Sequence, residues 1–183
     1  MNPSLVGSEM CIRDSSHAGL VAKYWFESIA KIPCQVDIAS DYRYRDIIAQ
    51  PDTLFVTISQ SGETADTLAA LRYAKKLDYV ATLAICNVAT SSLVRESDIS
   101  ILTMAGQEIG VASTKAFTTQ LAILLVLSIV LARRTGLTMA QEAKLVKELH
   151  KLPGIVEKTL GLRKKIKTIA KQFSDKHLSL IHI

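Results

Sequence analysis

Short runs of apolar, largely β-branched residues alternate along this chain with longer segments in which apolar residues recur every three or four positions. The short runs predict strands, and they are residues 34–39, 52–59, 79–86 and 99–103. The longer segments predict helices, and they are residues 15–32, 65–77, 91–96, 113–134, 139–152 and 155–173. Because right-handed crossovers place helices over both faces of such a sheet, this order predicts an α/β fold with a flavodoxin-like, doubly wound parallel sheet of about five strands.

Composition excludes several classes of protein. The 183 residues suffice for one domain with a core, and 49% apolar against 21% charged residues excludes a disordered chain. The three cysteines, at positions 11, 34 and 86, form no C-x-x-C pair and have no histidine placed to complete a zinc site, so we expect no metal and no cofactor. Their odd number and wide spacing indicate a reducing compartment, so we expect a cytoplasmic protein. The longest apolar run, residues 121–132, is shorter than the roughly 20 residues of a membrane span, so we expect a buried helix.

The net charge of +5 is concentrated near the C-terminus. Residues 139–176 carry ten basic and four acidic side chains, a local charge of +6, and the rest of the chain carries −1. The cations recur at helical spacing opposite apolar residues, and no aromatic residues alternate with them as stacking platforms. We therefore interpret them as a solvated helix face and expect no nucleic-acid partner.

The turn that follows residues 52–59 carries three hydroxyl groups and one glycine, in the order Ser59-Gln60-Ser61-Gly62-Glu63-Thr64. Ligands of parallel α/β sheets bind beyond the carboxyl ends of the strands, which predicts that this turn lies in the binding crevice, facing a loop around Ser15. Hydroxyl groups and the N–H groups of a helix start can hold an anion without lysine, and Gly62 permits a tight backbone turn. Since the Gly-Lys-Ser/Thr ending of a Walker loop is absent, the pattern indicates a monophosphate.

A purely structural role for these hydroxyls is the alternative. Ser61 and Thr64 would then only cap the following helix, which is worth about 1 kcal/mol. One cap needs one hydroxyl, whereas this turn supplies three and the Gln60 amide, so we favour phosphate binding. At the second helix start, Ser113 and Thr114 form a weaker pattern, and capping is the favoured interpretation there.

Four blocks of the sequence closely resemble the glucosamine-6-phosphate synthases, the isomerising glutamine:fructose-6-phosphate aminotransferases. They are Ser59–Leu68, Ala84–Val88, Ser91–Asp98 and Glu108–Gln120, and the resemblance covers roughly residues 17–177. It implies a sugar isomerase (SIS) lobe, the first of two in that family's isomerase domain. The resemblance further implies a set of residues that hold the phosphate and sugar of the substrate: Ser59, Gln60, Ser61, Thr64, Ser15, Val111 and Ser113.

The resemblance implies a function that this chain would share with other parts of a larger enzyme. In that family an N-terminal glutaminase domain supplies ammonia, and the two lobes convert fructose 6-phosphate into glucosamine 6-phosphate. The catalytic Lys, Glu and His belong to the second lobe, so we expect this chain to bind a sugar phosphate, to have no catalytic residue, to be inactive alone and to form part of a homodimer. We do not interpret Glu63, Glu108 or His17 as a catalytic residue. A glutamate at position 63 is explained by the dipole of the helix start, Glu108 orients its loop, and His17 has a structural role.

Both ends depart from the family pattern. The family has a strand ending in Cys-Gly-Thr-Ser before the first helix, and here only Ser15 matches, because Asp14 replaces the expected threonine. A carboxylate beside a bound phosphate would repel it. Residues 1–15, in place of the first strand, and residues 178–183 look non-native and resemble translated sequencing-adapter read-through. We therefore divide the chain into residues 1–15, a SIS lobe at 16–136, a helical connector at 137–177 and a tail at 178–183.

Two other functions remain open. In the first alternative, the chain is a stand-alone SIS module that binds a phosphosugar in a transcriptional regulator, or it is another phosphosugar isomerase. A helix-turn-helix region before the lobe would favour the regulator, and the sequence shows none. The basic tail would alternatively bind nucleic acid with an affinity that falls steeply with salt.

Overall fold

The computed structural model of the chain describes residues 3–50, 52–108 and 115–174, with side chains from residue 14 onward. Contacts divide the chain into two compact units, Met1–Thr138 and Met139–Ile183. The candidate site lies in the first unit, which contains the sheet and its core.

The sheet of the first unit is parallel, as predicted. Its strands are β1 (Leu54–Ser59), β2 (Ala81–Cys86) and β3 (Ile99–Leu102), and they lie in the order β1-β2-β3. The register pairs Ser59 with Cys86 and Cys86 with Leu102, so the carboxyl ends of all three strands meet at one edge. Three strands among the described residues are fewer than the five or so that we expected.

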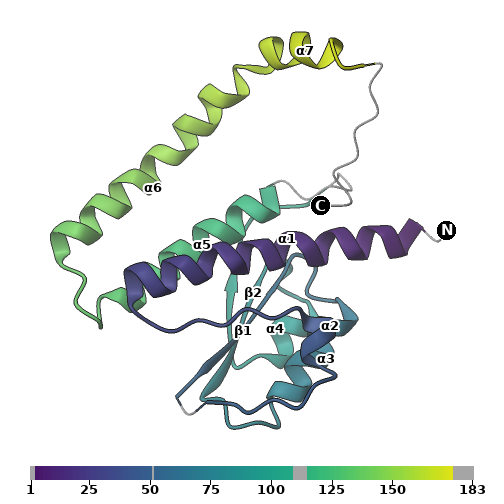
Figure 1. Ribbon diagram of the computed structural model, residues 1–183, viewed down its shortest axis with the longest axis vertical. Coiled ribbons are helices and arrows are strands. Elements are labelled where there is room, and N and C mark those ends of the chain that lie inside the picture. The colour runs from purple at the N-terminus through teal and green to yellow at the C-terminus, as the bar shows by residue number, and fades with distance from the viewer. Residues whose placement is uncertain (1–2, 51, 109–114, 175–183) are drawn as a thin grey trace. The chain divides into compact units, whose positions relative to one another are not determined.

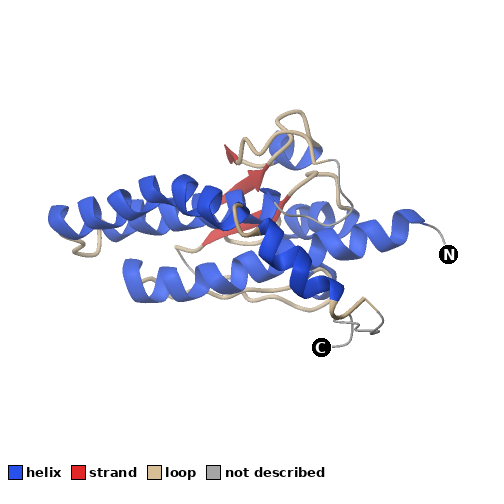
Figure 2. Cartoon of the chain, turned by 90° about the horizontal axis from the view of Figure 1, so that it is seen from above, coloured by secondary structure: helices blue, strands red, loops and turns tan. Residues whose placement is uncertain are grey.

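Helices flank the strands on both faces, which confirms the doubly wound α/β architecture (Figures 1 and 2). On one face lie α1 (Pro3–Trp25), the π-helical η1 (Phe26–Ala30) and α5 (Lys115–Ala132). On the other face lie α3 (Ala65–Ala74) and α4 (Ser92–Glu96). The short α2 (Ala39–Tyr42) packs on α3 through Tyr42, beside Ala70 and Ala74.

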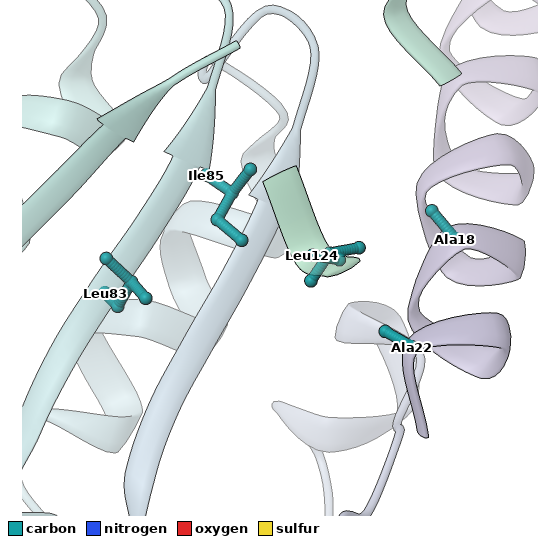
Figure 3. Packing of buried hydrophobic residues seen from close by; sticks show 5 residues of the cluster. All are labelled: Ala18, Ala22, Leu83, Ile85 and Leu124. Carbon is teal, nitrogen blue, oxygen red and sulfur yellow. The ribbon is translucent and has the colours of Figure 1, made fainter. Parts of the chain in front are cut away.

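Strand β2 supplies side chains to both faces because successive residues of a strand point in opposite directions. Leu83 and Ile85 pack with Leu124 of α5 and with Ala18 and Ala22 of α1 (Figure 3). Ala84 packs with the helices of the opposite face. This burial on both faces explains why residues 79–86 are a nearly unbroken apolar run.

Helix α5 is long and apolar enough to cross a membrane by length and composition. Six of its 18 residues, a third, are buried, and Leu124 packs against the sheet, so one face of α5 belongs to the core of the first unit. Val126 and Val130 are exposed, so the prediction of a buried helix for residues 121–132 holds for that face only. Helices α1 and α5 run parallel, since Gln120 of α5 donates a hydrogen bond to Ser15 in the middle of α1, and Thr135, after the end of α5, donates one to Ala30, after the end of α1.

Two predictions about the N-terminal region are wrong. The first helix begins at Pro3 rather than near Ser15, although it ends as expected, with Lys31 left-handed and Pro33 following. Residues 34–38 form no strand, and residue 39 begins α2. A strand needs a neighbour for its N–H and C=O groups, and the segment before Ser15 that would have supplied one is helical. Val36 instead packs beside Gly19 of α1.

The second unit consists of α6 (Met139–Leu160) and α7 (Arg163–Lys171), neither of which has a buried residue. The predicted break at Pro153-Gly154 is wrong, because α6 continues through Pro153 and ends before Gly161. A proline inside a helix costs about 3 kcal/mol, and the surrounding run of good helix formers offsets that cost because propagation is cooperative.

Candidate functional site

The turn between β1 and α3 occupies the carboxyl edge of the sheet, where the sequence predicted it. Strand β1 ends at Ser59, and α3 begins at Ala65 with Thr64 at its N-cap position. The Asn87 N–H donates to the Gln60 carbonyl at 3.3 Å, which ties the turn to the segment that follows β2. The turn is thus fixed at the start of a ten-residue helix, whose N-terminus carries about half a positive charge.

Two hydroxyls of the turn accept hydrogen bonds from its own backbone. Ser59 Oγ accepts from the Gly62 N–H at 3.0 Å, and Ser61 Oγ accepts from the Glu63 N–H at 3.3 Å. A serine hydroxyl has one hydrogen and two lone pairs, so each oxygen that accepts keeps its hydrogen for another partner. Ser59 is buried, whereas Ser61 is half-buried, so Ser61 is the more accessible donor.

The Thr64 side chain does not cap the helix. Thr64 has the extended N-cap backbone, with φ −65° and ψ 120°, but makes no side-chain capping hydrogen bond. The Ser61 hydroxyl bonds the Glu63 N–H, which lies before α3 rather than in its first turn. The capping alternative therefore does not describe what these two side chains do here.

Gly62 is required by both backbone geometry and packing. Its φ is +67°, in the left-handed region that favours glycine. A Cβ at this position would lie 2.6 Å from Ser91 Cβ and 2.7 Å from Cys86 Sγ, closer than side-chain carbons tolerate. The Gly62 carbonyl also accepts from the Leu93 N–H at 3.1 Å. Close packing against β2 and α4 thus fixes the shape of the turn.

The two glutamates of the region hold helix starts. Glu63 Oε1 accepts from the Ser92 N–H at 2.6 Å, and this hydrogen bond holds the pKa of the Glu63 carboxyl below its usual range. Glu108 Oε2 accepts from the Ala116 N–H at 3.1 Å at the start of α5. A base near neutral pH would need a raised carboxyl pKa, so the lowered pKa of Glu63 argues against that role.

Asn87 organises the segment between β3 and α5, and sequence reasoning assigned it no role. Its Nδ2 donates to the Gly106 carbonyl at 2.8 Å, and its Oδ1 accepts from Thr103 Oγ1 and from the Ala105 N–H. The available signal was a polar residue placed directly after the carboxyl end of a buried strand. Asn87 thereby draws the start of the β3–α5 segment to the same edge as the turn.

Ser15 lies inside α1 rather than in a loop, which corrects our expectation. Its side chain is buried, and its Oγ accepts from Nε2 of Gln120 in α5 at 3.1 Å. Gln120 is the second residue that sequence reasoning missed, although it stood out as a lone amide before an apolar run. Val111 and Ser113, together with Thr114, lie outside the described residues, and His17 is exposed on α1.

Other features of the first unit lie apart from this edge. A surface hollow of about 410 Å³ at the C-terminal end of η1 is lined by Glu27, Lys31, Ile32 and Pro33. Within residues 14–50, 52–108 and 115–174, whose side chains the structure describes, no three His, Cys, Asp or Glu side chains gather as a metal site would need. The turn and the residues tied to it are therefore the candidate site.

Comparisons with known proteins agree with this architecture. The glutamine–fructose-6-phosphate aminotransferase (isomerizing) of Pseudomonas putida is 59% identical over 167 residues, which are 91% of this chain and 27% of that protein. The protein of the same name from Haemophilus ducreyi is 56% identical over the same share. This chain thus spans about a quarter of the length of these relatives.

Solved structures show the same fold. The C-terminal domain of glucosamine-fructose-6-phosphate aminotransferase from Francisella tularensis superposes with a TM-score of 0.87 at 54% identity, covering 89% of this chain and 46% of that one. A phosphosugar isomerase structure from Bacillus subtilis, at 21% identity and a TM-score of 0.69, matches in fold. The SIS domain family matches residues 10–130, about two thirds of the sequence. The parallel sheet, its flanking helices and this match together show that the chain belongs to the SIS domain family.

Proposed function

We propose that this chain is the fructose 6-phosphate-binding lobe of the isomerase domain of a glutamine–fructose-6-phosphate aminotransferase. The observation that carries the proposal is the turn Ser59–Thr64, which sets uncharged donors at the start of α3 on the carboxyl edge of the sheet. The names of the relatives at 56–59% identity support the choice of substrate. The bound sugar phosphate would be converted into glucosamine 6-phosphate by the whole protein.

The proposed ligand set combines the turn with two other segments. The phosphate oxygens accept from hydroxyls of the turn and from the Gln60 amide, and the sugar lies toward the start of α5. The proposed residues are Ser59, Gln60, Ser61, Thr64, Ser15, Val111 and Ser113. Hydrogen bonds to an anionic oxygen are about twice as strong as neutral ones, so a few hydroxyls and the α3 dipole suffice without a lysine.

Catalysis is assigned to parts of the larger protein. Neither Glu63 nor Glu108 is a candidate base, since each carboxylate already accepts a backbone N–H at a helix start. The chain alone is therefore proposed to bind substrate without turning it over and to need no cofactor. In the whole protein it would form part of a cytoplasmic homodimer.

A stand-alone regulatory module and a nucleic-acid-binding protein are the rival functions. The relatives' names favour the enzyme lobe over a regulator. The basic side chains of α7 share a nine-residue helix with exposed Ile166 and Ile169, which fits a solvated amphipathic helix. We propose a small-molecule ligand, with no nucleic-acid or membrane partner.

Titration of the isotopically labelled chain with fructose 6-phosphate, followed by NMR of the amides of residues 59–65, tests the proposal. Thr64→Val keeps the shape of the side chain and removes only the hydroxyl, and no helix cap is lost because the side chain makes none. A hydrogen bond to a charged group contributes about 1.5–3 kcal/mol, so the dissociation constant of Thr64→Val should rise roughly 10- to 100-fold. Ser61→Ala should weaken binding in the same direction.

Ser100→Ala, on the exposed face of β3, is the matched control and should leave the affinity unchanged. Asp14→Thr should strengthen binding, because it removes a carboxylate next to Ser15 in α1. The proposed function would be refuted if fructose 6-phosphate caused no chemical-shift change at the amides of residues 59–65. It would also be refuted if the dissociation constant were unchanged in both Ser61→Ala and Thr64→Val.

A further inference from the structure

Gln120 is a polar side chain at a core position of an apolar helix. The buried positions of α5 include 116, 120 and 124, one turn apart on the face that packs against the sheet and α1. Gln120 is 2% exposed, and its neighbours on this face are Ala116 and Leu124. Packing alone would be served by an apolar residue, so the amide calls for another explanation.

The amide has one partner for its nitrogen and none for its oxygen. Gln120 Nε2 donates to Ser15 Oγ at 3.1 Å, whereas Gln120 Oε1 is buried without a donor among the residues that the structure describes. Turning the amide over would let Oε1 accept from Ser15 but would leave the two N–H donors of the amide without that partner. Either orientation leaves two hydrogen-bonding groups of the amide unpaired, and in the structure it is the nitrogen that faces Ser15.

This orientation fixes the role of the Ser15 hydroxyl. Because Ser15 Oγ accepts from Gln120, its own hydrogen is directed to a different partner. An anionic oxygen accepts hydrogen bonds and donates none, so a hydroxyl held as a donor recognises it.

A series of hydrogen bonds places the Gln120–Ser15 pair near the carboxyl edge of the sheet. Asn87, directly after β2, bonds the Gly106 carbonyl, and Glu108 bonds the Ala116 N–H at the start of α5. Gln120 follows one turn later and bonds Ser15 of α1. Gly19, one turn after Ser15 in α1, lies beside Ile58, the residue before Ser59, so the pair lies toward the edge that carries the Ser59–Thr64 turn.

We propose that Gln120 is a positioning residue for the sugar phosphate: its amide N–H holds Ser15 Oγ as an acceptor, so that the Ser15 hydroxyl donates its hydrogen to the ligand. This inference rests on the proposed function, because it assigns Ser15 to the phosphosugar site. Gln120 itself makes no contact with the ligand.

Gln120→Met in the whole chain tests this role, because methionine keeps the length and unbranched shape of the side chain and removes the donor. The dissociation constant for fructose 6-phosphate should rise about 5- to 10-fold, as expected for the loss of one hydrogen bond of typical strength. The urea midpoint should stay the same or rise, because the unpaired buried carbonyl is removed as well. Ser128→Ala, a buried polar residue of α5 two turns further along, is the matched control and should leave the affinity unchanged.

A double-mutant cycle separates positioning through Ser15 from a general effect on the fold. Ser15→Ala should weaken binding by itself, and Gln120→Met should add nothing in that background. A ligand-free readout is the side-chain NH₂ signal of Gln120, which should shift on Ser15→Ala. An unmoved NH₂ signal, additive effects of the two substitutions, or parental affinity in Gln120→Met would each overturn the inference while leaving the proposed function intact. Absence of binding by the parent chain would instead refute the proposed function, and the positioning role with it.

Discussion

Replacing Gly62 by alanine should destabilise the first unit through two separable effects. The left-handed backbone, with φ +67°, costs a residue with a side chain about 1–2 kcal/mol. The new methyl group would lie 2.6 Å from Ser91 Cβ and 2.7 Å from Cys86 Sγ, and such overpacking costs about 1–3 kcal/mol. Gly62→Ala should therefore lower the free energy of unfolding by about 2–5 kcal/mol.

Gly106→Ala is the matched control for the backbone effect. Gly106 has a φ of +71°, and a Cβ there would meet nothing within 4 Å. Its expected loss is about 1–2 kcal/mol, from the backbone alone. In both variants alanine also stabilises the folded chain by about 0.4–1 kcal/mol, because it lowers the conformational entropy of the unfolded chain. This contribution and the backbone cost cancel when the two variants are compared, so the difference in their unfolding free energies isolates the packing effect at Gly62.

Urea unfolding followed by the fluorescence of Trp25 measures both variants. Trp25 is the single tryptophan of the chain and packs against the core of the first unit, so its signal reports that unit. Ser91→Gly in the Gly62→Ala background removes the atoms nearest to the new methyl group and should recover the packing part of the loss. Equal losses in Gly62→Ala and Gly106→Ala, with no recovery by Ser91→Gly, would refute the reasoning.

Two further predictions concern stability away from the turn. Asp98 Oδ2 accepts from the Thr82 N–H and Oγ–H at 2.8 and 2.7 Å, and these hydrogen bonds hold the pKa of Asp98 below its ordinary value of 3.8. The stability that these bonds provide is present above the unfolded-state pKa of Asp98 and is lost as the pH falls through its lower folded-state pKa. Below about pH 4, the urea midpoint should therefore fall less in Asp98→Asn than in the parent chain. An equal fall in the two proteins would contradict this prediction. Pro153→Ala restores a backbone N–H inside α6 and removes a cost of about 3 kcal/mol. The helical circular dichroism signal of the chain should therefore persist to higher temperature. An unchanged melting curve would argue against a continuous α6.

Local pattern was sufficient for the elements whose formation depends on adjacent residues. The strand ending at Ser59, the turn and the helix beginning at Ala65 follow one another as predicted, because strand propensity, turn chemistry and helical periodicity are properties of neighbouring residues. The buried strand of residues 81–86 and the helix of residues 115–132 were recognisable for the same reason.

The sequence by itself determined that this chain is an α/β protein with a hydroxyl-rich turn after a strand. Only the tertiary structure decided that residues 34–38 pair with no strand, that Ser15 lies within a helix, that Ser91 and Cys86 close around Gly62, and that Gln120 meets a serine 105 positions away. The reason is that a ladder or a buried hydrogen bond needs a partner from elsewhere in the chain. Periodicity along the sequence specifies which face a residue occupies, but not which residue comes to lie opposite it.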